Sequence, residues 1–97
     1  MVRILHLNLK GIYWDAIKKG EKKVEYRVRN YYWSKRLERR EYDLIRLCRG
    51  YPRRGDDSKI IYRKWNGYRT GLLKHAEFGD EEVLVYLIDV SEEADLP

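Results

Sequence analysis

The chain has 97 residues, enough for one compact domain, and its 43% hydrophobic and 13% aromatic residues argue against disorder despite a charged fraction of 38%. All 21 Lys and Arg residues lie within residues 1–76, which carry +13, whereas residues 77–97 carry −8. A basic body beside an acidic end favours a polyanionic partner, although ordinary solvated surface charge produces the same count.

Several classes of site find no support. The single cysteine, Cys48, excludes an internal disulfide and leaves no pair for structural zinc. No apolar stretch approaches the roughly 18 residues of a membrane span and no signal peptide opens the chain, so we expect a cytoplasmic protein with no membrane partner. Glycine-rich nucleotide loops, HExxH and GxSxG are also absent.

The first part of the chain predicts a strand, a helix and a second strand. Residues 3–9 alternate between apolar and polar side chains, which is the period of a strand. Residues 11–19 predict a short helix with Ile12 and Ile17 on its inner face. Residues 23–29 alternate again, with apolar side chains on one face and charged side chains on the other.

The remaining elements follow at short intervals. Asn30 is placed to cap a helix over residues 31–40. Asn66-Gly67 is a turn sequence that predicts a hairpin onto residues 68–73. We also expect strands over residues 42–48, 59–65 and 82–90, the last buried on both faces, and a frayed tail over residues 91–97. This predicts a single mainly β (α+β) domain over residues 1–97, a closed or partly open β-barrel of five to six strands with two short helices.

The charged face of residues 23–29 has two interpretations. It can be a solvent-facing strip in which Glu25 pairs with basic neighbours. Alternatively, Lys22, Glu25 and Arg27 form a site with the aromatic residues that follow, because a carboxylate among cations can act as a base and guanidinium and aromatic groups hold phosphate and base. Residue types alone do not separate these alternatives.

A resemblance to a known family adds to the second interpretation. Residues 20–27 read G-E-K-K-V-E-Y-R and match G-x-K-x-x-E-x-R, the signature of ASCH domains, at all four specified positions. The motif follows a first strand and a short helix, as it does in that family. Tyr32-Trp33, Arg36-Leu37 and Gly50-Tyr51-Pro52 look like features of small free-standing bacterial and phage members.

The resemblance implies a PUA-like barrel that binds RNA or nucleotides, with the motif lining a cleft beside the first helix. Some bacterial members are similar to ribonucleases, which makes single-stranded RNA cleavage the leading expectation, with Lys22, Glu25 and Arg27 as catalytic residues. Others hydrolyse N4-acetylcytidine with the motif lysine, a threonine and a distal glutamate. Glu25 stands where those enzymes have threonine, and Glu77 and Glu82 are both candidates for the distal glutamate. A non-catalytic RNA-binding regulator is a third possibility, and no cofactor is implied beyond a possible divalent metal ion.

Basic and aromatic side chains around the motif predict the rest of a nucleic-acid interface. Residues 35–54 hold eight Lys and Arg against three acids, which is typical of a phosphate track or of a solvated helix face and loop. His6 and His75 have no spaced partner and are expected to be surface residues. The residues expected to contact nucleic acid are Lys23, Arg29, Tyr32, Trp33, Arg36, Arg53 and Arg54.

Overall fold

The structure is a computed structural model that describes residues 1–74, 76 and 79–95. The described part contains six strands, two α-helices and one 3-10 turn. In chain order these are β1 (Ile4–Leu9), α1 (Gly11–Lys18), β2 (Val24–Val28), α2 (Tyr31–Leu37), β3 (Leu44–Arg49), η1 (Asp57–Lys59), β4 (Ile60–Lys64), β5 (Tyr68–Leu73) and β6 (Val83–Asp89). The predicted class, mainly β with five to six strands and two short helices, is confirmed.

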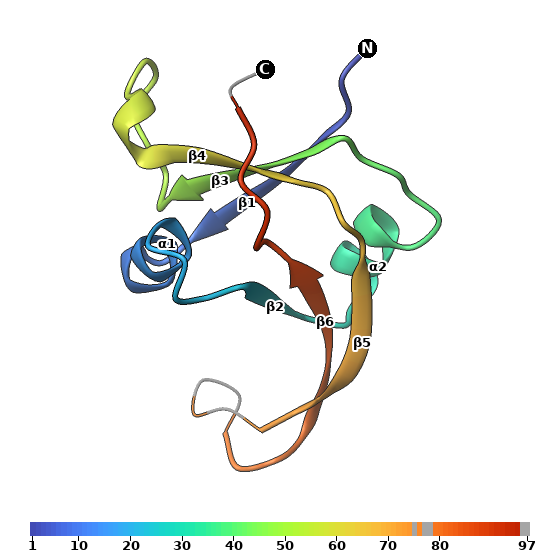
Figure 1. Ribbon diagram of the computed structural model, residues 1–97. Coiled ribbons are helices and arrows are strands. Elements are labelled where there is room, and N and C mark those ends of the chain that lie inside the picture. The colour runs from blue at the N-terminus through green and yellow to red at the C-terminus, as the bar shows by residue number, and fades with distance from the viewer. Residues whose placement is uncertain (75, 77–78, 96–97) are drawn as a thin grey trace.

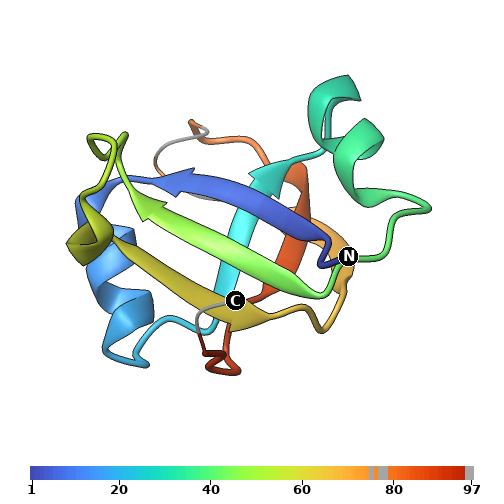
Figure 2. The same cartoon turned by 90° about the horizontal axis from the view of Figure 1, so that it is seen from above.

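The strands form two three-stranded sheets (Figure 1). The first has the order β1-β3-β4, with β1 and β3 parallel and β3 and β4 antiparallel. The second has the order β2-β6-β5 and is antiparallel throughout. Seen from above, the strands of one sheet cross those of the other at a steep angle, and α1 and α2 lie at opposite ends of the domain (Figure 2).

One hydrophobic core lies between the sheets. The alternation of β1 directs Leu5, Leu7 and Leu9 inward, where they are buried against residues of the other elements. Helix α1 covers one end of this core, and the indole Nε1 of Trp14 donates a hydrogen bond of 3.0 Å to the Leu47 carbonyl. The other buried apolar side chains of the core are Ile17, Leu37, Ile45, Leu47, Tyr86, Ile88 and Val90.

The segment after β6 joins the second sheet to the first. The Val90 amide donates to the Lys23 carbonyl, and the Lys64 amide donates to the Glu92 carbonyl. Glu93 then forms an antiparallel bridge with Arg63 of β4. The expected frayed tail is therefore wrong for residues 91–95, because strand-like hydrogen bonds tie them to β4, and residues 96–97 lie outside the described part. The two ladders remain separate sheets among the described residues, so closure into a barrel stays a prediction.

Three local predictions need correction. Asn66-Gly67 closes no hairpin between β4 and β5, since β4 pairs with β3 and β5 pairs with β6, and the turn carries the chain from one sheet to the other. The second helix ends at Leu37 and not near residue 40, because Glu38 is extended and Arg39 has a φ of 60°. Ile12 is exposed, and Trp14 with Ile17 forms the buried face of α1. Within the described residues, no helix has the length and apolar character to span a membrane.

Candidate functional site

The charged face of β2 points into the molecule. In the antiparallel ladder Glu25 lies opposite Ile88 and Arg27 lies opposite Tyr86, and both of these β6 residues belong to the core. Because directly opposite residues share one face of a sheet, Glu25 and Arg27 share the inner face. Glu25 is 6% exposed. The solvent-facing strip, one of the two interpretations of this strand, is therefore wrong for Glu25.

Lys22 reaches the same place through the turn that ends α1. The Glu21 and Lys22 amides both donate to the Ala16 carbonyl, with distances of 2.9 and 3.1 Å. Gly20 permits this tight reversal because its φ is +83°, a conformation that side-chain-bearing residues rarely adopt. The glycine of the motif thus brings Lys22 to the start of β2, where its side chain reaches Glu25.

The three charged groups form a compact cluster. Arg27 Nη2 lies 2.8 Å from Glu25 Oε2 and also donates a 2.9 Å hydrogen bond to the Asn8 carbonyl of β1. Lys22 Nζ lies 3.8 Å from Glu25 Oε1. Each carboxylate oxygen therefore faces its own cation, and Arg27 links the second sheet to the edge of the first.

Aromatic rings surround the cations. Lys22 Nζ lies 4.4 Å from the ring centre of Tyr26 and 5.4 Å from that of Tyr13. The Arg27 guanidinium lies 4.8 Å from the ring centre of Trp33 on α2. These distances are typical of cation–π contacts. The cations are thereby held in place by groups that a nucleobase or another flat ligand can also contact.

A cleft of about 430 Å³ opens beside this cluster, within the size range of ligand sites. It lies between β1 and α1 on one side and β2 and α2 on the other. Among the described residues that line it, Glu25 alone carries a carboxylate. Besides the seven residues above, the lining residues are Leu9, Lys10, Val28, Asn30 and Leu73.

Burial shifts the protonation of two groups in the cleft. It raises the pKa of the Glu25 carboxyl above its usual range, although the charges of Arg27 and Lys22 oppose this. Burial also lowers the pKa of the Lys22 ammonium, with Glu25 opposing and Arg27 reinforcing the effect. A carboxylate that gains a proton more easily and an ammonium that loses one more easily are suited to general base and general acid roles.

The described residues show no cluster of three or more His, Cys, Asp or Glu side chains that could hold a metal ion. Both oxygens of Glu25, the carboxylate considered as a ligand for a divalent ion, face cations already. The arrangement found here therefore offers general acid–base chemistry and charge stabilisation at the protein's own side chains.

Only some of the residues predicted to contact nucleic acid lie at or near the cleft. Trp33 lines the cleft, whereas Tyr32 and Arg36 lie on α2 outside it, Tyr32 exposed and Arg36 half-buried. Lys23 and Arg29 lie just beyond the ends of the β2 ladder and do not line the cleft, because Lys23 faces a different hollow and Arg29 Nε lies 3.6 Å from Glu38.

The basic residues between 35 and 54 do not form one row. Arg53 and Arg54 are exposed in the β3–β4 loop, which lies near α1 at the opposite end of the domain from α2 and Arg36 (Figures 1 and 2). Strand β3 separates these two groups, and its six residues span roughly 20 Å.

The remaining candidates from the sequence stay outside the cluster. His6 is exposed on β1 and pairs in register with Arg46, and partial burial together with the charge of Arg46 lowers its pKa. Glu82 is exposed and does not line the cleft. His75 and Glu77 lie outside the described residues.

Sequence reasoning missed Asn8, Tyr13 and Tyr26 as parts of the site. Tyr26 belongs to the opposite face of the strand from Glu25, yet both line the cleft, because β2 is an edge strand and the cleft wraps around it. Asn8 contributes its backbone carbonyl, which carries no sequence signature. The aromatic residue Tyr13 could have been noted from its place on the helix that directly precedes the motif.

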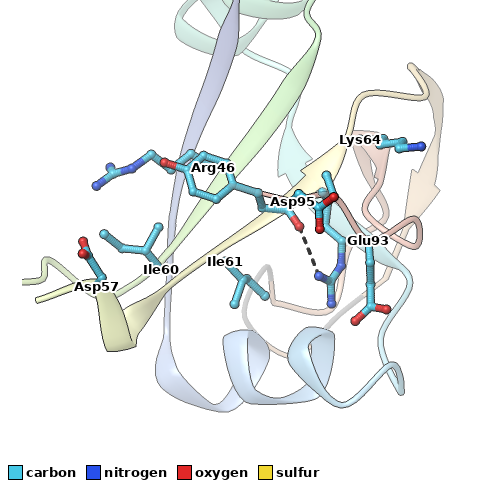
Figure 3. Close-up of a pocket in the computed structure, with 10 residues that line it drawn as sticks. Arg46, Asp57, Ile60, Ile61, Lys64, Glu93 and Asp95 are labelled. Carbon is cyan, nitrogen blue, oxygen red and sulfur yellow. Dashed lines mark hydrogen bonds between the residues drawn. The ribbon is translucent and has the colours of Figure 1, made fainter. Parts of the chain in front are cut away.

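A larger groove of about 750 Å³ lies beside β4 and the C-terminal segment (Figure 3). Its charged groups are mixed in sign, and Figure 3 shows the Arg46 guanidinium directed away from Glu93 and Asp95. Arg63 in this groove is buried, and its three guanidinium nitrogens donate to the carbonyls of Val90, Tyr62 and Ile17. These contacts give Arg63 a structural role, so the smaller cleft is the stronger candidate site.

Comparisons of the chain with protein-family models, with curated proteins and with solved structures gave no match. The resemblance to ASCH domains therefore depends on the motif and on its place in the order of elements.

Proposed function

We propose that this protein is an RNA-processing domain of the ASCH type that binds single-stranded RNA and cleaves it in the cleft at Lys22, Glu25 and Arg27, with the cytoplasm as its expected location. The observation that carries the proposal is a 6% exposed carboxylate between an ammonium and a guanidinium, inside a cleft walled by aromatic rings. An ordinary surface ion pair lies in solvent and contributes at most about 1 kcal/mol, so it does not account for a buried carboxylate in a cleft.

The groups of the cleft match the parts that RNA cleavage requires. Glu25 accepts the proton of a 2′-hydroxyl, whose oxygen attacks the adjacent phosphorus. Arg27 and Lys22 stabilise the negative charge that grows on the phosphate. As the bond to the 5′-oxygen breaks, Lys22 donates a proton to that oxygen, which leaves a 2′,3′-cyclic phosphate and a 5′-hydroxyl. The raised pKa of Glu25 and the lowered pKa of Lys22 favour these two proton transfers.

The aromatic walls and the charge of the chain support RNA as the ligand. Tyr13, Tyr26 and Trp33 present ring surface on which an unpaired base can stack. Residues 1–76 carry +13, so binding of a polyanion is favoured and is expected to weaken as salt is raised.

Amide hydrolysis of an acetylated nucleoside has less support. Its mechanism uses a hydroxyl where this chain has the Glu25 carboxylate, and the described candidate for the distal glutamate, Glu82, lies away from the cleft.

A matched pair of lysine variants tests the proposal. Lys22 and Lys23 are neighbours, but Lys22 lines the cleft and Lys23 does not. Lys22→Ala should lower the rate of cleavage of a single-stranded RNA by about 10²-fold or more, the range of a lost general acid, whereas Lys23→Ala should change it only a few-fold. Melting temperatures should stay close to that of the unmodified protein in both variants.

The substrate provides a second control, because the same oligonucleotide made as DNA lacks the attacking hydroxyl and should remain intact. Full activity of Lys22→Ala would overturn the assignment. RNA binding without any cleavage would identify a non-catalytic binding domain, and release of cytidine from N4-acetylcytidine would favour the amidohydrolase.

A further inference from the structure

Two cationic and two aromatic side chains form a row that leads out of the cleft along α2. The Arg27 guanidinium lies 4.8 Å from the ring centre of Trp33. The rings of Trp33 and Tyr32 meet edge to face, with their centres 4.9 Å apart. The guanidinium carbon of Arg36 then lies 3.4 Å from the ring centre of Tyr32. The row therefore begins at the buried ion pair and ends at the surface.

At the outer end of the row Tyr32 is exposed, Arg36 is half-buried, and both side chains are already ordered. Tyr32 is 53% exposed. Arg36 Nη1 donates a 3.0 Å hydrogen bond to the Tyr32 carbonyl, which holds the guanidinium over the ring. The helix beneath is anchored at both ends, because the Asn30 side chain accepts from the Trp33 amide and Leu37 is fully buried. Tyr32 and Arg36 thus form a flat platform that needs little reordering to receive a ligand.

The charge of Arg36 is not neutralised within the described part of the chain. No described carboxylate lies within 4.0 Å of Arg36, whereas Arg29, also near α2, lies 3.6 Å from Glu38. A planar guanidinium without a counterion attracts phosphate and stacks on nucleobases. The platform therefore combines the two properties that a nucleotide subsite requires.

We propose that Tyr32 and Arg36 form a second stacking subsite, which holds the base of the nucleotide next to the one bound in the cleft. This inference rests on the proposed function, because it takes the cleft to hold the first nucleotide. In this arrangement the RNA strand leaves the cleft over Trp33 and crosses α2. The β3–β4 loop, which holds the exposed Arg53 and Arg54, lies at the opposite end of the domain from α2 and is not part of this path (Figures 1 and 2).

Binding of a nucleoside 3′-phosphate and of a deoxydinucleotide tests the subsite. The deoxy ligand lacks the 2′-hydroxyl and is not cleaved, and both dissociation constants can be measured by calorimetry. The unmodified protein should bind the dinucleotide about 5- to 150-fold more tightly than the mononucleotide, the range expected for stacking of one added base. Tyr32→Ala should remove this gain and leave mononucleotide affinity unchanged within about two-fold.

Three further variants separate stacking from general effects. Tyr31→Ala is the matched control, since Tyr31 is 81% exposed on the same helix but lies outside the row, and it should keep the gain. Arg53→Ala should keep it as well. Arg36→Lys retains the charge and loses the flat guanidinium, so the gain should fall.

Each result bears on a definite claim. Equal affinity for the two ligands in the unmodified protein, or a full gain in Tyr32→Ala or Arg36→Lys, overturns the stacking subsite while the cleft proposal stands. Absence of binding by both ligands overturns the subsite and the nucleotide-binding cleft together.

Discussion

Replacing Arg27 by methionine would leave the Glu25 carboxylate buried without its nearest cation. Removal of one partner of a buried ion pair typically costs about 3–5 kcal/mol, because the other charge is left uncompensated. Lys22 Nζ would remain 3.8 Å from Oε1, which offsets part of this cost. The substitution also removes the hydrogen bond that Arg27 donates to the Asn8 carbonyl and the contact of Arg27 with Trp33, each contributing about 1 kcal/mol. We therefore expect the free energy of unfolding at pH 7 to fall by about 3–4 kcal/mol.

A double-mutant cycle isolates the pair from these side effects. Glu25→Gln alone should cost about 1–2 kcal/mol, because it leaves two cations facing each other. Glu25→Gln combined with Arg27→Met removes both charges, so its stability should lie within about 2 kcal/mol of the unmodified protein and the coupling should amount to roughly 2 kcal/mol or more.

Urea unfolding followed by tryptophan fluorescence gives the free energy of unfolding of all four proteins. In a separate thermal experiment, each kcal/mol of lost stability should lower the melting temperature by about 4–8 °C for a domain of this size. At pH 4 the cost of Arg27→Met should shrink, because the carboxyl becomes protonated. A loss below about 1 kcal/mol at pH 7, or singles that simply add, would show that Glu25 is not a desolvated charge held by Arg27.

Three other predictions concern titration and stability. Because burial raises the pKa of Glu25 in the folded state, the stability advantage of the unmodified protein over Glu25→Gln should be largest below the usual glutamate pKa of about 4.3 and should shrink, as pH rises through the raised value, toward the cost of about 1–2 kcal/mol expected at pH 7; a stability difference that is constant from pH 4 to 8 would contradict this. Arg63→Met should cost about 2–4 kcal/mol by leaving the buried Val90 and Ile17 carbonyls without donors, and Arg63→Lys should recover only part, as chemical denaturation can check. Asn30→Ala should cost about 1 kcal/mol through loss of the cap of α2 and Asn30→Asp much less, so equal melting temperatures for the two variants would refute the capping role.

Local patterns were sufficient to place the strands and the two α-helices of this chain, although not the end of α2. The alternation of residues 3–9 and 23–29 identified β1 and β2, and Asn30 caps α2 as its position predicted. These features are readable because the periods of strands and helices and the preferences of caps depend on near neighbours. The grouping of Lys22, Glu25 and Arg27 was likewise readable, since the three residues lie within six positions of one another.

Tertiary structure decided what local patterns leave open. Alternation shows that residues 23–29 have two faces, but the pairing of β2 with β6, about 60 residues later, turns the charged face toward the core. The turn at Asn66-Gly67 is a local event, whereas the partners of β4 and β5 are chosen by distant strands, so the predicted hairpin was wrong. Asn8, Tyr13 and Trp33 meet the motif only because both sheets enclose one core. The sequence by itself determined which residues could form the site, and long-range packing determined that Glu25 is desolvated there, because removal from water depends on every element that surrounds a group.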